Sequence, residues 1–134
     1  MPGYSRVSSV AAYQSAAAHG GVAAADPHGL IVMLMDGALE RIRAACGCIE
    51  RGDLAEKARL LHRTISIIAE LRGSLDMNAG GQISENLSEL YDYMNRRLLV
   101  ASSENLSEPL EEVSALLNEI RTAWVAIPAR VRYR

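Results

Sequence analysis

The sequence has no phenylalanine, one tryptophan and only two cysteines among its 134 residues. Two cysteines are too few for a scaffold held together by disulfides and are typical of a reducing compartment. The longest uninterrupted apolar run, residues 30–35, has six residues, whereas a helix that crosses a membrane needs about 20. The N-terminus lacks a charged start followed by a long apolar stretch, so we expect no signal peptide. These absences predict a cytoplasmic protein that does not insert into membranes.

The composition indicates one folded, helical domain. Apolar residues make up 49% of the chain and the formal net charge is −2, which excludes a disordered chain of low hydrophobicity and high charge. Abundant alanine and leucine, with few aromatic residues, favour helices over a sandwich or barrel. The length is typical of a single domain.

Apolar spacing predicts two helices in the first half of the chain. Asp26 is a good N-cap and Pro27 suits the first helical position, while Gly52 is expected to end the first helix. Asp53 then caps the second, with Glu56 three residues on. The predicted seams consist of Ile31, Met35, Ala38, Ile42, Ala45 and Ile49 in the first helix and of Leu54, Ala58, Leu61, Ile65 and Ile68 in the second, where Leu60, Ile67 and Leu71 form an additional apolar row.

Two more helices are predicted in the second half. The glycine pair in residues 77–81 predicts a turn, residues 101–105 are expected to form a loop, and Ser107 is expected to cap the last helix, which Pro128 stops. Glu108 and Glu111 suit its first turn, where the helix dipole favours anions. The predicted seams are Ile83, Leu87, Tyr91, Met94 and Leu98, followed by Leu110, Val113, Leu117, Ile120, Trp124 and Ile127.

Short connections between the helices predict an all-α fold, an antiparallel up-down-up-down four-helix bundle. The bundle is expected over residues 26–127, after a mobile N-terminal arm or short helix at 1–25 and before a basic, frayed tail at 128–134. The residues expected in its core are Ile42, Leu61, Ile65, Met94, Leu117 and Ile120.

Motifs for catalysis or cofactor binding are missing. No glutamate has a histidine three residues later, the pattern of metal sites in bundles, and Cys46 and Cys48 lie two apart on a helix, so their side chains diverge. The histidines lack ligand spacing and are interpreted as surface or cap-region residues, and no loop matches a phosphate cradle. We expect no enzyme, metal or cofactor, and the pI of about 5.9 with no basic stripe indicates no nucleic-acid partner.

The informative feature is an excess of apolar surface. Residues 30–35 are apolar all around the expected helix, whereas a bundle helix normally hides one stripe and exposes the other. Dense packing in the bundle, together with the arm, would explain this. The alternative is a groove for another polypeptide, which the arm shields when it is empty.

The chain also resembles a known family. Residues 26–38 (DPHGLIVMLMDGA) resemble the first-helix signature of the flagellin export chaperones, the FliS family. The matches continue through 71–76 (LRGSLD), Gly80-Gly81, Asn86-Leu87 and 90–94 (LYDYM) to Ala123-Trp124. One departure is Met35, where the family often has tyrosine.

The resemblance implies a non-enzymatic cytoplasmic chaperone that binds the disordered C-terminal segment of flagellin, prevents premature polymerisation and helps to deliver it to the flagellar export apparatus. The client would fold into helices in a groove. From the apolar rows we predict as the groove lining Leu30, Leu34, Leu60, Ile67, Leu71, Leu87 and Tyr91, although the same rows could complete the bundle. Val10 and Tyr13 in the arm are predicted to dock on this groove before the client arrives. The alternatives are a histidine phosphotransfer domain using His62 and a self-assembling structural bundle; whether the chain forms a homodimer is left open.

Overall fold

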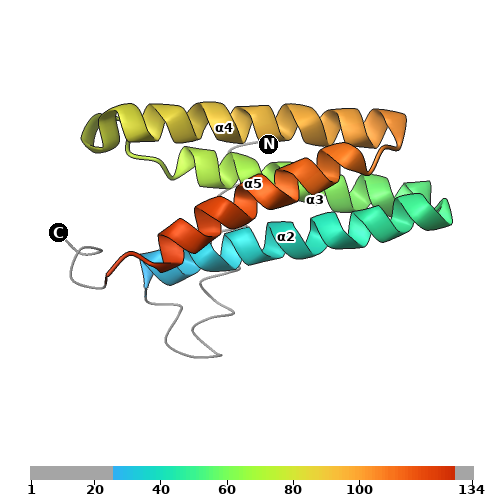
Figure 1. Cartoon of the computed structure of the whole chain (residues 1–134), viewed down its shortest axis with the longest axis horizontal. Coiled ribbons are helices and arrows are strands. Elements are labelled where there is room, and N and C mark those ends of the chain that lie inside the picture. Colours follow the sequence, from blue (N-terminus) through green and yellow to red (C-terminus); the bar gives the residue numbers. More distant parts are fainter. Residues whose placement is uncertain (1–25, 129–134) are drawn as a thin grey trace.

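The structure is a computed structural model and describes residues 26–128. Within this range the chain forms four helices and no strand: α2 (Pro27–Arg51), α3 (Leu54–Gly73), α4 (Met77–Glu104) and α5 (Glu108–Val125). The predicted all-α class is therefore confirmed for this part of the chain. In Figure 1, α2 and α4 lie along opposite long edges, α3 lies behind, and α5 crosses obliquely in front.

The first connection follows the predicted capping chemistry. The Asp26 carboxylate accepts a hydrogen bond from the His28 backbone N–H (2.9 Å), and Pro27 occupies the first helical position. Gly52 ends α2 with φ at 73°, a left-handed conformation that glycine adopts without steric cost. Asp53 accepts from the Glu56 N–H (3.4 Å) and caps α3. Local sequence therefore determines where α2 ends and α3 begins.

The start of α4 differs from the predicted turn. Residues 77–80 form a helical turn, which Asp76 caps by accepting from the N–H groups of Asn78 and Ala79. The expected break is a kink inside the helix at Gly81 (φ 53°, ψ −129°). Beyond the kink, the Ser84 hydroxyl donates back to the carbonyl of Asp76 (3.0 Å).

The predicted loop at residues 101–105 was wrong. α4 continues to Glu104 and ends at Asn105, whose left-handed backbone (φ 55°) directs its N–H to the carbonyl of Ala101. Ala101 is completely buried. Its packing in the core stabilises the helical conformation of the polar residues 102–104 that follow it. Ser107 stands at the N-cap position of α5 but makes no side-chain capping bond, and α5 ends at Val125, before Pro128.

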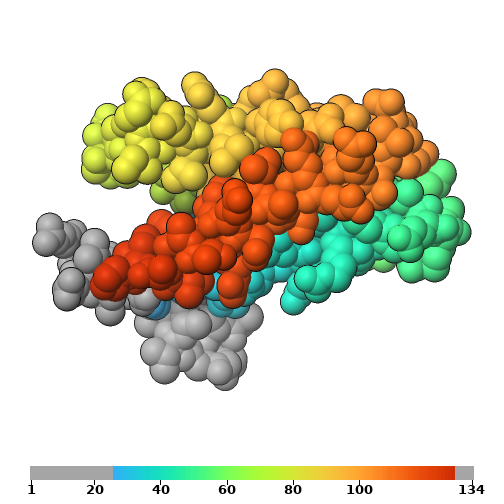
Figure 2. All heavy atoms as spheres, in the orientation of Figure 1, coloured from blue at the N-terminus to red at the C-terminus, as the bar shows by residue number. Residues whose placement is uncertain are grey.

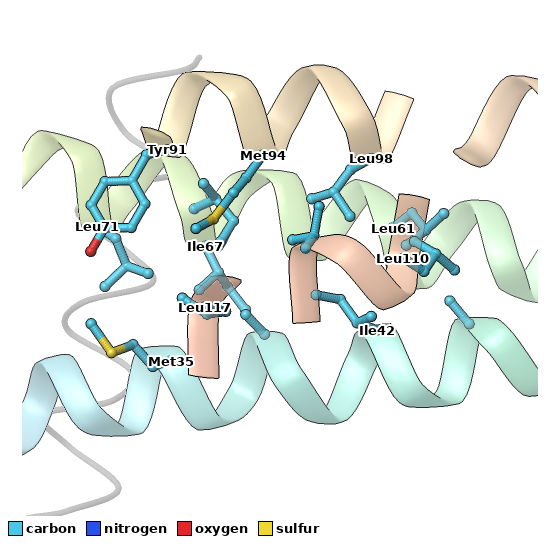
Figure 3. Packing of buried hydrophobic residues seen from close by; sticks show 14 of the residues in the cluster. Met35, Ile42, Leu61, Ile67, Leu71, Tyr91, Met94, Leu98, Leu110 and Leu117 are labelled. Carbon is cyan, nitrogen blue, oxygen red and sulfur yellow. The ribbon is translucent and has the colours of Figure 1, made fainter. Parts of the chain in front are cut away.

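The core runs along the axis of the bundle and takes side chains from all four helices (Figure 3). Four of the six predicted core residues are fully buried, with at most 1% exposure: Ile42, Leu61, Met94 and Leu117. Ile65 and Ile120 are only partly buried and pack against the core from its margin.

The buried face of α3 is rotated from the predicted seam toward the second apolar row. Leu54 is 44% exposed, whereas Ile67 and Leu71 lie in the core. The reason is that α3 packs against α2 and α4 at once, so its buried stripe is centred between the two partners. Lys57 supports the α4 side through a hydrogen bond from Nζ to the carbonyl of Ser102 (2.6 Å).

Candidate functional site

α5 begins against α4 and ends against α2. Near its start, the Glu112 carboxylate accepts hydrogen bonds from the Tyr93 hydroxyl (2.6 Å) and from Arg97 Nε (2.8 Å), both on α4. These bonds, the one from Tyr93 foremost, lower the pKa of Glu112. Further along, Arg121 Nε donates to the Asp36 carboxylate on α2 (2.5 Å). The side-chain bonds of α5 therefore reach α4 near its start and α2 near its end, in line with its oblique course in Figure 1.

The last turn of α5 is joined to the first turn of α2 by a reciprocal pair. Trp124 Nε1 donates to the backbone carbonyl of His28 (3.0 Å). His28 Nε2 lies 2.6 Å from the carbonyl oxygen of Trp124 and must carry the proton, because a carbonyl oxygen only accepts. The two rings stack with their centroids 4.8 Å apart. Both ends of the pair are thus fixed by hydrogen bonds and by ring contact.

This oblique course leaves part of α4 uncovered. Ile83, Leu87, Leu90 and Met94 follow spacings of four, three and four residues and so share one face of the helix. Met94 is completely buried, which identifies this face as the one directed at the core. Along the same face, Leu90 and Leu87 are half-buried and Ile83 is 72% exposed. The core-facing stripe of α4 therefore continues beyond the region that α5 covers.

A matching row lies on α5. Val113, Leu116 and Ile120 are spaced by three and four residues; Val113 is completely buried, whereas Leu116 and Ile120 are half-buried. The space-filling view shows a hollow between the first half of α4, in yellow, and the last half of α5, in red (Figure 2). We define the apolar groove as the surface formed by Ile83, Leu87 and Leu90 on α4 and by Leu116 and Ile120 on α5.

Core residues underlie the groove at this end of the bundle. In Figure 3 the Tyr91 ring lies over Leu71, with Met35 on the α2 side. Tyr91 is 3% exposed, and burial raises its pKa to about 12. Its hydroxyl therefore stays protonated over the physiological pH range and keeps its capacity to donate a hydrogen bond.

The exposed side chain of Ile83 makes burial of the groove by a binding partner energetically favourable. Full burial of an isoleucine side chain contributes about 1.5–3 kcal/mol relative to exposure, and most of that gain is unrealised when 72% of the residue is accessible. Contiguous exposed apolar patches on folded proteins commonly mark interaction sites. The groove can therefore hold the apolar side of another segment, while nothing in its lining indicates covalent chemistry.

The predicted groove residues fall into two groups. In the isolated chain Leu34, Ile67, Leu71 and Tyr91 lie in the core, with 0–3% exposure. Leu30, Leu60 and Leu87 are half-buried. Of the seven, Leu87 lies in the apolar groove and Leu71 and Tyr91 lie beneath it. Their contact with a client stays a prediction, and the arm residues Val10 and Tyr13 lie outside the described residues.

Sequence reasoning missed most of the groove lining. Ile83 was expected on the inward face of its helix, and it does lie on the face that α4 directs at the core. Its exposure of 72% could not be predicted. Leu90 and Leu116 had not been assigned to a groove, and Ile120 was expected in the core. Apolar spacing reports which residues share a face, but whether a neighbour covers that face depends on the course of α5.

Residues considered for other chemistry are dispersed. Within residues 26–128, no group of three or more His, Cys, Asp and Glu side chains is arranged to hold a metal ion. His62 is exposed on α3, and Cys48 is buried while Cys46 is partly so. Burial raises the pKa of the Cys46 thiol. No helix in the described range is long and apolar enough to cross a membrane.

Comparison with known proteins reveals close relatives. The sequence profile of the family described as "Flagellar protein FliS" matches residues 9–131. The chain is 44% identical over 115 residues to the flagellar secretion chaperone FliSB of Pseudomonas aeruginosa, covering 86% of this chain and 91% of the relative. It is 41% identical over 128 residues to the flagellar secretion chaperone FliS of Salmonella typhimurium, covering 95% of both chains. The Vibrio cholerae chaperone of the same name is 35% identical over 120 residues, covering 90% of this chain and 88% of the relative.

Proposed function

Since this chain belongs to the FliS family, and so has an export-chaperone role in flagellum assembly, we propose that its client is the C-terminal segment of flagellin. By binding this disordered segment, the protein prevents premature polymerisation and delivers flagellin to the export apparatus. We place this action in the cytoplasm, where a newly made client is met before export. The proposal includes no catalytic step and no cofactor.

The observation that carries the proposal is the uncovered continuation of the core-facing stripe of α4. Ile83 at 72% exposure extends a row that ends in the buried Met94, so an added helix would complete the packing that α5 leaves unfinished. Peptide helices recognised in this way place apolar residues at i, i+3, i+4 and i+7 into a hydrophobic groove. The spacing along α4 suits such a partner.

A disordered client explains why the contact surface has to be apolar and extended. Ordering a segment as it binds costs about 2–5 kcal/mol of the gross interaction energy. Each large aliphatic side chain that becomes buried returns about 1.5–3 kcal/mol. Ile83, which is 72% exposed, can gain most of this free energy. Leu87 and Leu90 and their α5 counterparts are already half-buried and add smaller gains. Together they offset part of the ordering cost without many fixed polar contacts.

Two further parts of the proposal come from the sequence. The antiparallel up-down-up-down order is supported by the back-and-forth course of the ribbons in Figure 1. The N-terminal arm, through Val10 and Tyr13, is proposed to occupy the groove until the client displaces it. Leu30, Leu34, Leu60, Ile67, Leu71, Leu87 and Tyr91 remain the client-binding residues proposed from the sequence, with Leu87 directly in the groove described above.

A capture experiment tests the client directly. Immobilised full-length protein is mixed with flagellin that keeps or lacks its C-terminal tail. We expect retention of the tailed form only. Equal retention of both forms, or of neither, would contradict the proposal. Uptake of a labelled phosphoryl group by His62 would favour the phosphotransfer alternative, and association of the chain only with itself would favour a structural bundle.

A further inference from the structure

The last half of α5 is held on α2 by contacts that have no counterpart on α4. Arg121 pairs with Asp36, and one turn later Trp124 and His28 exchange two hydrogen bonds and stack their rings. All side-chain bonds between α5 and α4 in the described chain involve Glu112, near the start of α5. Beyond Glu112, the side-chain bonds from α5 to its neighbouring helices in the described chain therefore go to α2 alone.

We propose that His28 and Trp124 are positioning residues that keep the apolar groove open by holding the end of α5 on α2. We refer to this pair as the latch. The inference rests on the proposed function only where it concerns client affinity. The position of α5 itself is a property of the isolated chain.

The latch acts against the hydrophobic attraction between the apolar side chains of α4 and α5 that face each other across the groove. Leu116 and Ile120 on α5 are half-buried, and Ile83 across the hollow is largely exposed. Burying these side chains against one another is favourable, so an α5 released from α2 would move toward α4 and cover the face that a client needs. Glu112, which stays bound to Tyr93 and Arg97, would serve as the fixed end of this movement.

The geometry of the latch suits it to this task. His28 lies in the first turn of α2 and is held there by the cap at Asp26. Its ring N–H donates to the Trp124 carbonyl at the end of α5 (2.6 Å), which also accepts a longer bond from the backbone N–H of Ile127 (3.2 Å). The stacked rings add a broad contact, with an angle of 8° between their planes. Rotation or withdrawal of the end of α5 would break all three interactions together.

Distances between spin labels test the position of α5 without any client. In the full-length chain, Cys46→Ser and Cys48→Ala remove the native thiols, and Asn86→Cys on α4 and Ala123→Cys on α5 carry the labels at exposed positions. Double electron–electron resonance is recorded with and without His28→Ala. We expect a shorter mean distance in the His28→Ala protein. An unchanged distance, or one that increases, would overturn the proposal.

Two controls separate the latch from general loosening. A label pair at Leu99 and Glu111, near the end of α5 that stays on α4, should keep its distance in the His28→Ala protein. Thr122→Ala changes an exposed side chain in the same turn of α5, which bonds only within its own helix, and should leave both distances unchanged. If His28→Ala unfolds the chain, Trp124→Phe serves as the second variant, since it keeps an aromatic ring, although a smaller one, and removes the N–H that donates to the His28 carbonyl.

Affinity for a flagellin C-terminal peptide is the second readout. His28→Ala and Trp124→Phe should each weaken binding, His28→Ala by about tenfold or more, while Thr122→Ala binds as the wild type does. Wild-type affinity in a latch variant whose labels have moved together would contradict the link between position and binding. Absence of peptide binding in the wild type would refute the proposed client, whereas the label distances would still decide the role of the latch.

Discussion

At the scale of single residues, the same side-chain type serves opposite purposes according to its place in the bundle. Ile67 has no exposed surface and Ile83 is 72% exposed, although both lie on apolar helix faces. Shortening or charging Ile67 acts on folding, because a buried unpaired charge is strongly unfavourable. A polar change at Ile83 leaves the fold intact and acts on whatever the groove holds.

The core residue Leu61 offers a stability prediction. Leu61→Ala should lower the free energy of unfolding by about 2–5 kcal/mol, because removal of a buried leucine side chain loses apolar burial and leaves a cavity. Leu61 has no exposed surface, which gives the site little freedom to collapse from the solvent side. Urea denaturation of both proteins measures the difference. A loss below about 1 kcal/mol would mean that this face of α3 is less tightly packed than described.

At the scale of helices, capping and kinks follow from local chemistry, while exposure does not. Asp26, Gly52 and Asp53 were predicted as helix boundaries and occupy those positions, because a cap depends on residues a few positions apart. The prediction of a loop at 101–105 was wrong, because Ala101 packs into the core. That packing depends on residues far away in the sequence, which local patterns do not report. The exposure of Ile83 could not be predicted from local sequence either. It depends on whether α5 covers this face of α4, and the course of α5 is directed by contacts such as that of His28 with Trp124, 96 residues apart.

The kink in α4 gives a prediction for Gly81. Its backbone angles of φ 53° and ψ −129° are strained for residues with a side chain. Apart from its chain neighbours and the adjacent helix backbone, no atom lies within 4 Å of an added Cβ. The cost of Gly81→Ala is therefore conformational and should be about 1–3 kcal/mol. Thermal or urea unfolding measures it. An unchanged or increased stability would indicate that residues 77–80 adopt another path at little cost.

The junction of α4 and α5 gives a pH dependence. Hydrogen bonds from Tyr93 and then Arg97 lower the pKa of Glu112 in the folded protein. A carboxyl with a lowered folded-state pKa contributes stability above its unfolded pKa, about 4.3, and loses it as the pH falls through the folded value. Glu112→Gln removes this titration and should therefore lose less stability than the wild type between pH 7 and pH 3. Urea unfolding at both pH values tests this, and an equal acid-induced loss would refute it.

At the scale of the whole molecule, the two ends of the bundle differ. At one end α5 covers the core-facing side of α4, and at the other end that side stays partly exposed. α5 completes the packing where its first half lies against α4, and the apolar groove lies where its last half is bound to α2 instead (Figure 2). The all-α class and most of the core could be predicted from apolar spacing. The groove could not, because it results from the angle of one helix, and that angle is fixed by ion pairing, hydrogen bonding and ring stacking between chain ends.

Calorimetric titration of the full-length protein with a flagellin C-terminal peptide tests the central claim that the apolar groove binds the client. Ile83→Glu places a charge in the groove, and Leu99→Glu is the matched control. Leu99 is 56% exposed on the same helix, about 160° around its axis from Ile83 at 3.6 residues per turn. Ile83→Glu should weaken binding by about tenfold or more, at least about 1.4 kcal/mol, and Leu99→Glu should leave it unchanged, with both variants folded by circular dichroism. Equal affinity in the two variants, or a loss confined to Leu99→Glu, would contradict the account.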